Sequence, residues 1–316
     1  MTDIREVSFS IVYIITMIVA LAGNTLLIYI VWKKPGTRNL TTFLFVNMAV
    51  ADLLVAVFQI PISIAYFYFQ IQIPCEIFYY AVFVSSAASI FCLAVMAFDR
   101  YFAVVYPFRR SIWFRKPKII TPVVWISSMG LMSVAVVVFK FIGGFCRIDI
   151  TVISPLVFWS YILVIAYLLP LAIISILYII AGGKLWLHEV PLDHNASVNQ
   201  QQQQIPKKKV IRVLIIVAVV FAVCWLPVHV YQMDDSVKKG ASWPYALIYF
   251  CYWLSQANSA INPWLYIGLN GKMKAAFTKM IRCCRIGNKK TESYSLGTTA
   301  RSKAIFSKRS SLDTRL

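Results

Sequence analysis

The sequence predicts an all-α membrane protein, a seven-transmembrane helix bundle with a short amphipathic helix at the inner leaflet. Its 316 residues are 60% hydrophobic and only 14% charged, which is more apolar than a soluble domain of this length can hide. Seven apolar stretches are each long enough to cross about 30 Å of hydrocarbon as an α-helix. Long parts of them, such as Ser8–Trp32 and Ile77–Phe98, contain no Asp, Glu, Lys or Arg.

The elements are expected in a simple order along the chain. The seven spans are Phe9–Trp32, Thr41–Phe67, Ile77–Phe102, Ile119–Phe141, Pro155–Ile180, Val210–Gln232 and Trp243–Ile267. Residues 1–8 form a short extracellular N-terminus, and residues 9–267 form the seven-helix domain, with a flexible cytosolic loop at 185–205. In 268–285, Met273 and Phe277 share one helix face opposite lysines, which predicts the amphipathic helix. Residues 286–316 are expected to form a disordered cytosolic tail.

The distribution of the +19 net charge argues against nucleic acid as a partner. With these spans, all but five of the 31 basic residues fall on one side of the membrane, the five being Arg5, Lys140, Arg147, Lys238 and Lys239. Basic loops stay in the cytoplasm. The chain is therefore expected to be a multi-pass plasma-membrane protein with its N-terminus outside and its C-terminus in the cytoplasm.

The cysteines predict one disulfide and one lipid anchor. Cys75 and Cys146 both fall at the outer face, where the compartment is oxidising, so a disulfide between them is expected. It would hold the loop between the fourth and fifth spans over the mouth of the bundle. Cys283 and Cys284 follow the amphipathic helix on the cytosolic side and are predicted palmitoylation sites.

Polar side chains inside the hydrocarbon are costly, so each is a candidate functional residue. Asp52 is the only carboxylate well within a span. Its candidate partners at a similar depth are Asn24, Ser89, Asn258, Ser259 and Asn262. A carboxylate with hydroxyl and amide oxygens suits an allosteric sodium ion. The alternative is a protonated Asp52 in a static hydrogen-bond network, and no other cofactor is expected.

Three prolines interrupt the last spans. Pro170, Pro227 and Pro263 each remove a backbone hydrogen bond and permit a kink. Trp225 lies two residues before Pro227, which puts a bulky side chain beside a hinge.

These positions together resemble the rhodopsin-like (class A) G-protein-coupled receptors, and most of all the neuropeptide receptors, over about residues 9–285. Each span carries a family motif, in order: Gly23-Asn24; Asn47, Ala51, Asp52 and Leu53; Ser89 and Asp99-Arg100-Tyr101; Trp125; Pro170 and Tyr178; Phe221 and Cys224-Trp225-Leu226-Pro227; Asn258 and Asn262-Pro263-Trp264-Leu265-Tyr266. One triplet alone is weak, but the ordered set is very specific.

The resemblance implies a cell-surface receptor that binds an extracellular ligand and activates heterotrimeric G proteins. It implies a coupling switch at the inner end, formed by Asp99, Arg100, Tyr101, Tyr178 and Tyr266. It implies an activation core below the ligand, formed by Ile90, Pro170, Phe221, Trp225, Pro227, Asn262 and Pro263. It also assigns sodium to Asp52, with Ser89 and Asn258 as neighbours.

One position departs from the family pattern. Lys207-Lys208-Lys209 stand at the inner end of the sixth span, where many relatives have an acid that pairs with the helix-three arginine. The departure predicts either raised basal activity or an inactive state in which Asp99 alone holds the arginine.

The ligand class is inferred from what the outer half of the bundle carries. Val82 stands where amine receptors have an Asp, and the seventh span has no lysine for retinal. Acids and aromatic residues near the mouth suit a peptide with a basic group; the alternative is solvated acids and an aromatic interface belt. The predicted ligand contacts are Gln59, Val82, Trp225, His229, Asp234, Asp235 and Gln256.

The sequence features are less consistent with other classes of function. The first alternative is a receptor for a non-peptide small molecule, such as an amine, a lipid or a melatonin-like compound. A transporter or a photoreceptor is more remote, because the sequence shows no internal repeat and no retinal lysine. An enzyme is not expected, because His188, His194 and His229 do not converge.

The tail is rich in serine and threonine. Phosphorylation by receptor kinases would add negative charge and make it a ligand for arrestin. Its last residues, Thr314-Arg315-Leu316, resemble a PDZ-domain ligand, which adds a strand to a sheet edge. The alternative for this end is a tail that only solubilises.

Overall fold

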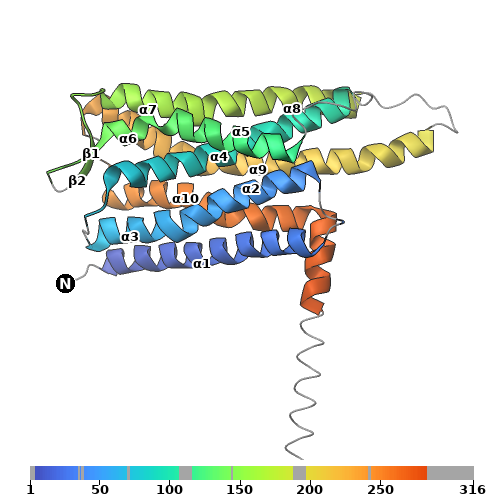
Figure 1. Ribbon diagram of the computed structural model, residues 1–316, viewed down its shortest axis with the longest axis horizontal. Coiled ribbons are helices and arrows are strands. Elements are labelled where there is room, and N and C mark those ends of the chain that lie inside the picture. Colours follow the sequence, from blue (N-terminus) through green and yellow to red (C-terminus); the bar gives the residue numbers. More distant parts are fainter. Residues whose placement is uncertain are drawn as a thin grey trace, which may run out of the picture. The chain divides into compact units, whose positions relative to one another are not determined.

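The computed structural model of the chain describes residues 4–34, 36, 39–69, 72–106, 116–143, 145–187, 197–240 and 243–282. It comprises two compact units, residues 1–270 and residues 271–316. In the first unit, helical spans run alternately in opposite directions, and a β-hairpin lies at one end (Figure 1). We call this the hairpin end, and the opposite end, where Arg100 lies, the Arg100 end. In the second unit, residues 271–282 form a helix.

The bounds of the elements are as follows. The first span is α1 (Ile4–Lys33), and the second consists of α2 (Leu40–Leu54), the π-helical turn η2 (Val55–Gln59) and α3 (Ile60–Phe69). The third is α4 (Cys75–Val105), and the fourth is α5 (Pro117–Met132) with α6 (Val134–Val138). The hairpin strands are β1 (Phe139–Ile142) and β2 (Phe145–Ile148). The fifth span is α7 (Pro155–Leu163), the π-helical turn η4 (Val164–Leu168) and α8 (Leu169–Leu187), followed by α9 (Ser197–Lys238) and α10 (Tyr245–Leu269).

The predicted fold class is confirmed. Among the described residues, six helical segments combine the length and the hydropathy of membrane-crossing helices. The seventh span, α10, has 25 residues and is also long enough to cross. Its hydropathy is lowered by polar residues that the bundle buries, namely Ser255, Gln256, Asn258, Ser259 and Asn262.

Two spans widen into a single π-helical turn just before a proline. The Ile60 amide donates to the Val55 carbonyl, and the Leu169 amide makes the equivalent bond in η4. Pro61 and Pro170 follow directly. Because a proline cannot donate a backbone hydrogen bond and its ring crowds the carbonyl four residues earlier, a wider turn relieves the conflict. The π-helical turn is how the structure accommodates Pro170.

Several helix ends differ from the sequence prediction by a few residues, as where α1 begins at Ile4 instead of Phe9, and at two places the type of element differs. The sequence predicts a fourth span that ends at Phe141, but the helix ends at Val138 and the next residues form β1. An apolar run suits either element, and pairing with β2 decides in favour of the strand. The sequence also predicts a loop over 185–205, whereas α8 continues to Leu187 and α9 begins at Ser197. Glutamine and lysine favour helix, so the sixth span continues into this polar run.

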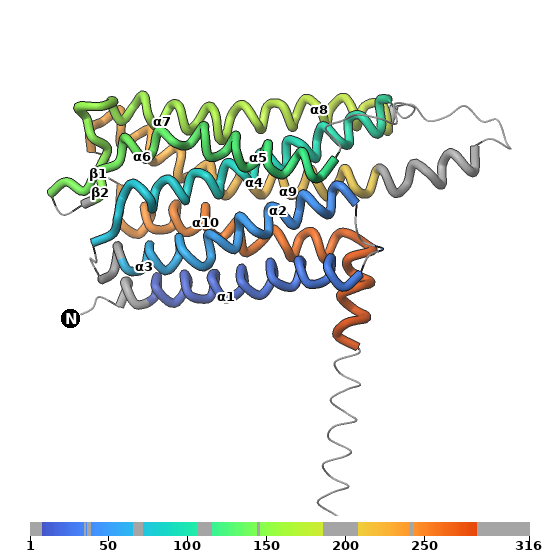
Figure 2. Tube along the Cα trace, viewed as in Figure 1, coloured from blue at the N-terminus to red at the C-terminus, as the bar shows by residue number. Residues whose placement is uncertain are grey.

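The central helix of the first unit is α4, which contacts α2, α5, α8 and α9. Helix α1 contacts α2 and α10, as Figure 2 also shows. Gly23 permits the close approach of α1 and α10. A Cβ atom at this position would lie 2.7 Å from Pro263 Cγ and 2.8 Å from Trp264 Nε1. Only glycine leaves room for these two rings without a shift of the helices.

Candidate functional site

The hairpin is attached to the bundle by a disulfide and by contacts between aromatic rings. Cys146 on β2 is disulfide-bonded to Cys75, the first residue of α4, with their Cα atoms 5.5 Å apart, so the predicted disulfide is confirmed. The ring of Phe139 on β1 stacks on that of Tyr79 of α4, with centroids 3.8 Å apart. Phe139 also packs edge-on against Phe158 of α7 at 5.4 Å. These contacts hold the hairpin against the ends of α4 and α7.

A small cavity of about 50 Å³ lies inside the bundle, bordered by residues of η2, α4, α7, η4, α9 and α10. Four of the seven predicted ligand contacts line it, namely Gln59, Val82, Trp225 and His229. The other three, Gln256, Asp234 and Asp235, are not among its lining residues. Gln256 is buried nearby in α10 and donates to Ser63 Oγ at 3.2 Å. Four of the predicted contacts thus border one cavity, whereas Gln256, Asp234 and Asp235 do not.

Ten further residues line the cavity and were not predicted from the sequence: Tyr79, Phe83, Ser86, Trp159, Ile162, Ala166, Val228, Gln232, Tyr252 and Ser255. Helical spacing could have found some of them. Ser86 lies one turn after Val82, and Gln232 lies one turn after His229, so each shares a helix face with a predicted contact. Gln232 donates to the Tyr252 hydroxyl and links α9 to α10 beside the cavity.

The acids at the hairpin end already have partners. Lys238 Nζ lies 2.7 Å from Asp234 Oδ1, and Trp243 Nε1 donates to Asp234 Oδ2 at 2.9 Å. Glu76 at the start of α4 pairs with Lys140 of β1 at 3.4 Å. A positively charged ligand group at Asp234 would thus compete with Lys238 for this carboxylate. The prediction that this acid receives the ligand stays a prediction.

Asp149 lies just beyond β2 and is fixed by Thr151. Its Oδ1 accepts a bond of 2.6 Å from the Thr151 hydroxyl and one of 2.9 Å from the Thr151 amide. Because both bonds favour the ionised carboxylate, they hold the pKa of Asp149 below its ordinary value. This side chain is a permanent negative charge between the hairpin and α7 at neutral pH.

The predicted activation core lies on the Arg100 side of the cavity. The ring of Phe221 is 5.9 Å from that of Trp225, and Phe221 is 1% exposed. Ile90 of α4 is fully buried. The hydroxyl of Tyr167, in the π-helical turn η4, donates to the Ala222 carbonyl at 2.8 Å. The widened turn before Pro170 is thereby bonded to α9 at the level of Phe221 and Trp225.

A buried polar cluster surrounds Asp52, which is 2% exposed. Asn262 Nδ2 donates to Asp52 Oδ2 at 3.2 Å, and Ser259 also bonds to this carboxyl group. Asn24 Nδ2 donates to the Ser259 carbonyl at 3.0 Å. Of the five predicted partners, Asn262 and Ser259 thus bond to Asp52 directly, and Asn24 joins them through the Ser259 carbonyl.

Several oxygens of the predicted sodium ligands lack a hydrogen bond. In the described part of the chain, no donor reaches Asn24 Oδ1, Ser89 Oγ, Asn258 Oδ1 or Asn262 Oδ1, all of which are buried. Buried polar atoms are normally satisfied, so such atoms call for an explanation. Hydroxyl and amide oxygens with one carboxylate are donors of the type that a hard cation takes, and these residues therefore fit a sodium ion.

At the Arg100 end, α4 and α10 are both bonded to the start of α2. Arg100 pairs with Asp99 and also donates to Thr41 Oγ1 at 2.8 Å. The hydroxyls of Thr42 and Tyr266 are 2.7 Å apart and hydrogen-bonded. Two consecutive threonines thus hold two residues of the predicted coupling switch. Neither threonine was predictable from the sequence, because a Thr pair at a helix start also suits ordinary capping.

Tyr178 and Tyr101, the other two aromatic residues of the predicted coupling switch, have different surroundings. The Tyr178 hydroxyl on α8 is buried and meets no hydrogen-bond partner among the described residues. Tyr101 packs its ring edge-on against Phe102 and Tyr106, at 5.3 and 6.1 Å. Lys184 of α8 donates to a carbonyl at the end of α4, which ties the fifth span to the third at this end.

These features define a class: a helical membrane protein with a small, mainly apolar cavity near one end, a buried polar cluster, and an arginine held at the other end. Residues 23–266 match the family described as 7 transmembrane receptor (rhodopsin family). Because the match covers more than half of the chain, this chain belongs to the rhodopsin family of seven-transmembrane receptors. These are G-protein-coupled receptors and not enzymes.

Known receptors resemble the chain over most of its length. It is 27% identical over 308 residues to the Tachykinin-like peptides receptor 86C of Drosophila melanogaster, covering 90% of this chain but only 60% of that protein. It is 28% identical to the Substance-K receptor of Mus musculus, over 87% of this chain and 75% of the relative. It is 26% identical to the Substance-P receptor of Homo sapiens, over 86% of this chain and 70% of that relative.

Proposed function

We propose that this chain is a plasma-membrane receptor that binds a neuropeptide outside the cell and activates heterotrimeric G proteins inside it. In this orientation the hairpin end is extracellular and the Arg100 end is cytoplasmic. The charge distribution supports it, because Lys33, Lys34, Lys116, Lys118 and Lys184 all belong to the Arg100 end. The disulfide supports it as well, because such bonds persist in the oxidising extracellular compartment.

The names of the relatives support a peptide as the ligand. They are receptors for tachykinin-like peptides, substance K and substance P. The cavity lining agrees, because Val82 offers no negative charge to pair with a small amine, and all the carboxylates of the described residues lie outside the lining. Its polar groups, such as Gln59, His229 and Gln232, are hydrogen-bonding groups that suit peptide amides.

The size of the cavity suggests how a peptide is held. Sites that enclose a drug-sized ligand measure about 300–1,000 Å³, whereas this cavity measures about 50 Å³. We infer that only the end of the ligand enters it and that the rest lies against the hairpin end. A basic group of the peptide would reach Asp234 or Asp235 there.

One observation carries the proposal: the cavity ends on Trp225, whose neighbour Phe221 is buried on the Arg100 side of it. A ligand tip in the cavity touches Trp225 directly, and Pro227 allows α9 to bend two residues away. A change of this bend would move the part of α9 that lies toward the Arg100 end of the bundle. The same helix thus connects ligand binding to G-protein activation.

The test is G-protein activation in cells that express the chain, with a neuropeptide library that includes tachykinin-type peptides and a parallel panel of amines and lipids. Activation by a peptide and by none of the small molecules is expected. The peptide should lose potency at least tenfold with His229→Ala, which removes a cavity side chain. Val230→Ala serves as the matched control, because Val230 is 47% exposed on the lipid side of the same turn. Activation by an amine or a lipid alone would refute the peptide proposal.

We also propose that sodium is an allosteric ligand at Asp52, held with oxygens of Ser89, Asn258, Asn24 and Asn262. Bound sodium would neutralise the buried carboxylate and favour the conformation described here. A ligand that prefers one conformation shifts the equilibrium only by the difference between its affinities for the two conformations. Sodium should therefore lower the affinity of an activating ligand.

The cytosolic end carries the remaining proposed partners. Cys283 and Cys284, the proposed palmitoylation sites, and the tail at 286–316 lie outside the described residues. We propose that receptor kinases phosphorylate the tail, that arrestin then binds it, and that Thr314-Arg315-Leu316 engages a PDZ domain. One residue appended after Leu316 should abolish PDZ capture and leave G-protein activation intact.

A further inference from the structure

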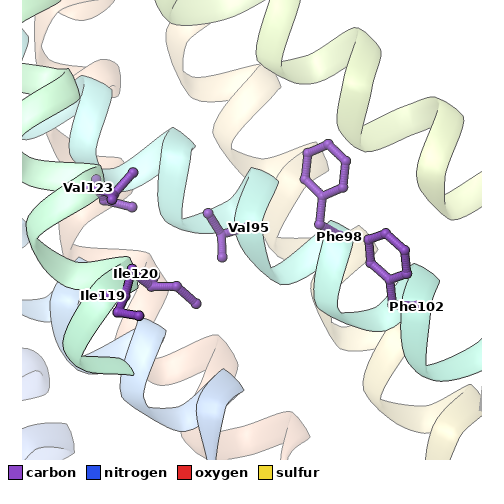
Figure 3. A pocket seen from close by; sticks show the side chains of 7 residues that line it. Val95, Phe98, Phe102, Ile119, Ile120 and Val123 are labelled. Carbon is purple, nitrogen blue, oxygen red and sulfur yellow. The ribbon is translucent and has the colours of Figure 1, made fainter. Parts of the chain in front are cut away.

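An apolar groove of about 390 Å³ lies between α4 and α5 near the Arg100 end. All seven lining residues are apolar: Val95, Phe98, Phe102, Ile119, Ile120, Val123 and Val124. Three of them belong to α4 and four to α5, and Figure 3 shows the six labelled side chains on these two helices. This groove is distinct from the cavity at Trp225, with which it shares no lining residue.

The groove is open to the surroundings of the bundle. Phe98 is 38% exposed and Val123 is 58% exposed, although both line it. In a membrane-spanning segment those surroundings are hydrocarbon chains. A void lined by apolar atoms forfeits dispersion contacts unless something fills it. The chemistry of the groove therefore matches an acyl chain rather than a polar ligand.

Positive charge stands at one end of this groove. Lys116 and Lys118 come at the start of α5, within one turn of the lining residues Ile119 and Ile120, and both lysines are exposed. The first turn of α5 contains no acidic residue, and its dipole adds further positive potential there. The carboxylate nearest along α4, Asp99, is 2% exposed and pairs with Arg100. Neither lysine forms an ion pair with a carboxylate of the described residues.

We infer that the groove is a binding site for an anionic phospholipid, with one acyl chain between α4 and α5 and the headgroup phosphate at Lys116 and Lys118. Charge complementarity selects this occupant over a zwitterionic lipid, because basic side chains at a membrane surface attract anionic headgroups. The bound chain touches Phe98 and Phe102, which flank Asp99 and Arg100 in sequence. The lipid thus stabilises the part of α4 that holds the arginine.

The experiment is photo-crosslinking of the full chain in phosphatidylcholine nanodiscs. One probe is phosphatidylserine with a diazirine in one acyl chain, and the other is phosphatidylcholine with the same chain. Mass spectrometry then maps the labelled residues. In the wild-type chain the serine lipid should label α4 and α5 within 95–124 at least fivefold more than the choline lipid. One basic side chain near an anionic surface accounts for a factor of about five.

Two pairs of variants separate charge from shape. Lys116→Gln with Lys118→Gln should abolish the preference for the serine lipid. Lys33→Gln with Lys34→Gln, which removes two charges from the same end of the bundle, should preserve it. Val123→Phe should fill the groove and lower labelling by both probes. Ile126→Phe, at a position 65% exposed and outside the groove, should not.

The wild-type comparison alone can overturn the inference, so it does not depend on any variant folding. Equal labelling by the two lipids, or labelling spread evenly over the lipid-facing helices, would refute it. A serine-lipid preference that survives loss of both lysines would refute the charged headgroup site. None of these outcomes bears on whether the ligand is a peptide.

Discussion

Replacing Thr41 by valine removes a hydroxyl that Arg100 reaches on another helix. In the structure the Arg100 guanidinium pairs with Asp99 on its own helix and donates to Thr41 Oγ1 at 2.8 Å. Thr41 is 5% exposed, so water does not readily replace the lost acceptor. The valine side chain has nearly the same shape, and the change therefore tests the hydrogen bond rather than the packing.

The expected size follows from the charge and the exposure of the arginine. A hydrogen bond to a charged group contributes about 1.5–3 kcal/mol, and the Arg100 side chain is 21% exposed, so the lower end applies. About 1.5 kcal/mol corresponds to a factor of roughly ten in an equilibrium constant. If the bond exists only in the resting conformation, Thr41→Val should raise ligand-independent activity about tenfold while the active fraction is small.

The assay is G-protein activation without ligand, divided by the amount of receptor at the cell surface. Thr41→Ser keeps the hydroxyl and should stay close to wild type. Thr121→Val is the control, because the Thr121 hydroxyl is buried and makes no hydrogen bond in the described part of the chain. Basal activity in Thr41→Val equal to that of wild type would refute the view that this bond restrains Arg100.

Three further predictions concern the disulfide, a close helix contact and the ion site. Cys146→Ser should lower surface expression, since loss of a native disulfide typically costs about 2–5 kcal/mol, and free-thiol labelling of this cysteine in the native chain would contradict the prediction. Gly23→Ala should lower the thermal unfolding midpoint, because its Cβ would lie 2.7 Å from the Pro263 ring, whereas Gly130→Ala meets no atom within 4 Å and should be neutral. Asp52→Asn should abolish the sodium dependence of agonist affinity, and an unchanged sodium response would remove the ion from this site.

The sequence predicted the fold because hydrocarbon leaves the backbone few choices. A span must satisfy its own hydrogen bonds, so its length and hydropathy are enough to locate it. The errors fall where this constraint ends. Phe139 and Phe141 are apolar enough for a helix, yet they lie in β1, where pairing with β2 decides the conformation. Ser197 begins a helix because local propensity outweighs the polar composition of that segment.

The sequence predicts how deep each candidate residue lies along its helix, but not which residues it contacts. Motif residues such as Asp52 and Arg100 are recognisable because polar groups in a span are rare. Their partners depend on how each helix is rotated, which periodicity alone does not fix. The bond between Gln232 and Tyr252 and the bond between Arg100 and Thr41 both join residues far apart in sequence. Only the packed structure brings such pairs together.

The most direct test of the central claim compares Arg100→Ala with the wild-type chain in the same cells, using the peptide that activates the receptor most strongly. Surface expression, peptide binding and G-protein activation are measured in parallel. Binding and expression should stay close to wild type, because the cavity lies at the other end of the bundle from Arg100. Activation should disappear. Undiminished activation by Arg100→Ala would contradict the account of this chain as a receptor that signals through Arg100.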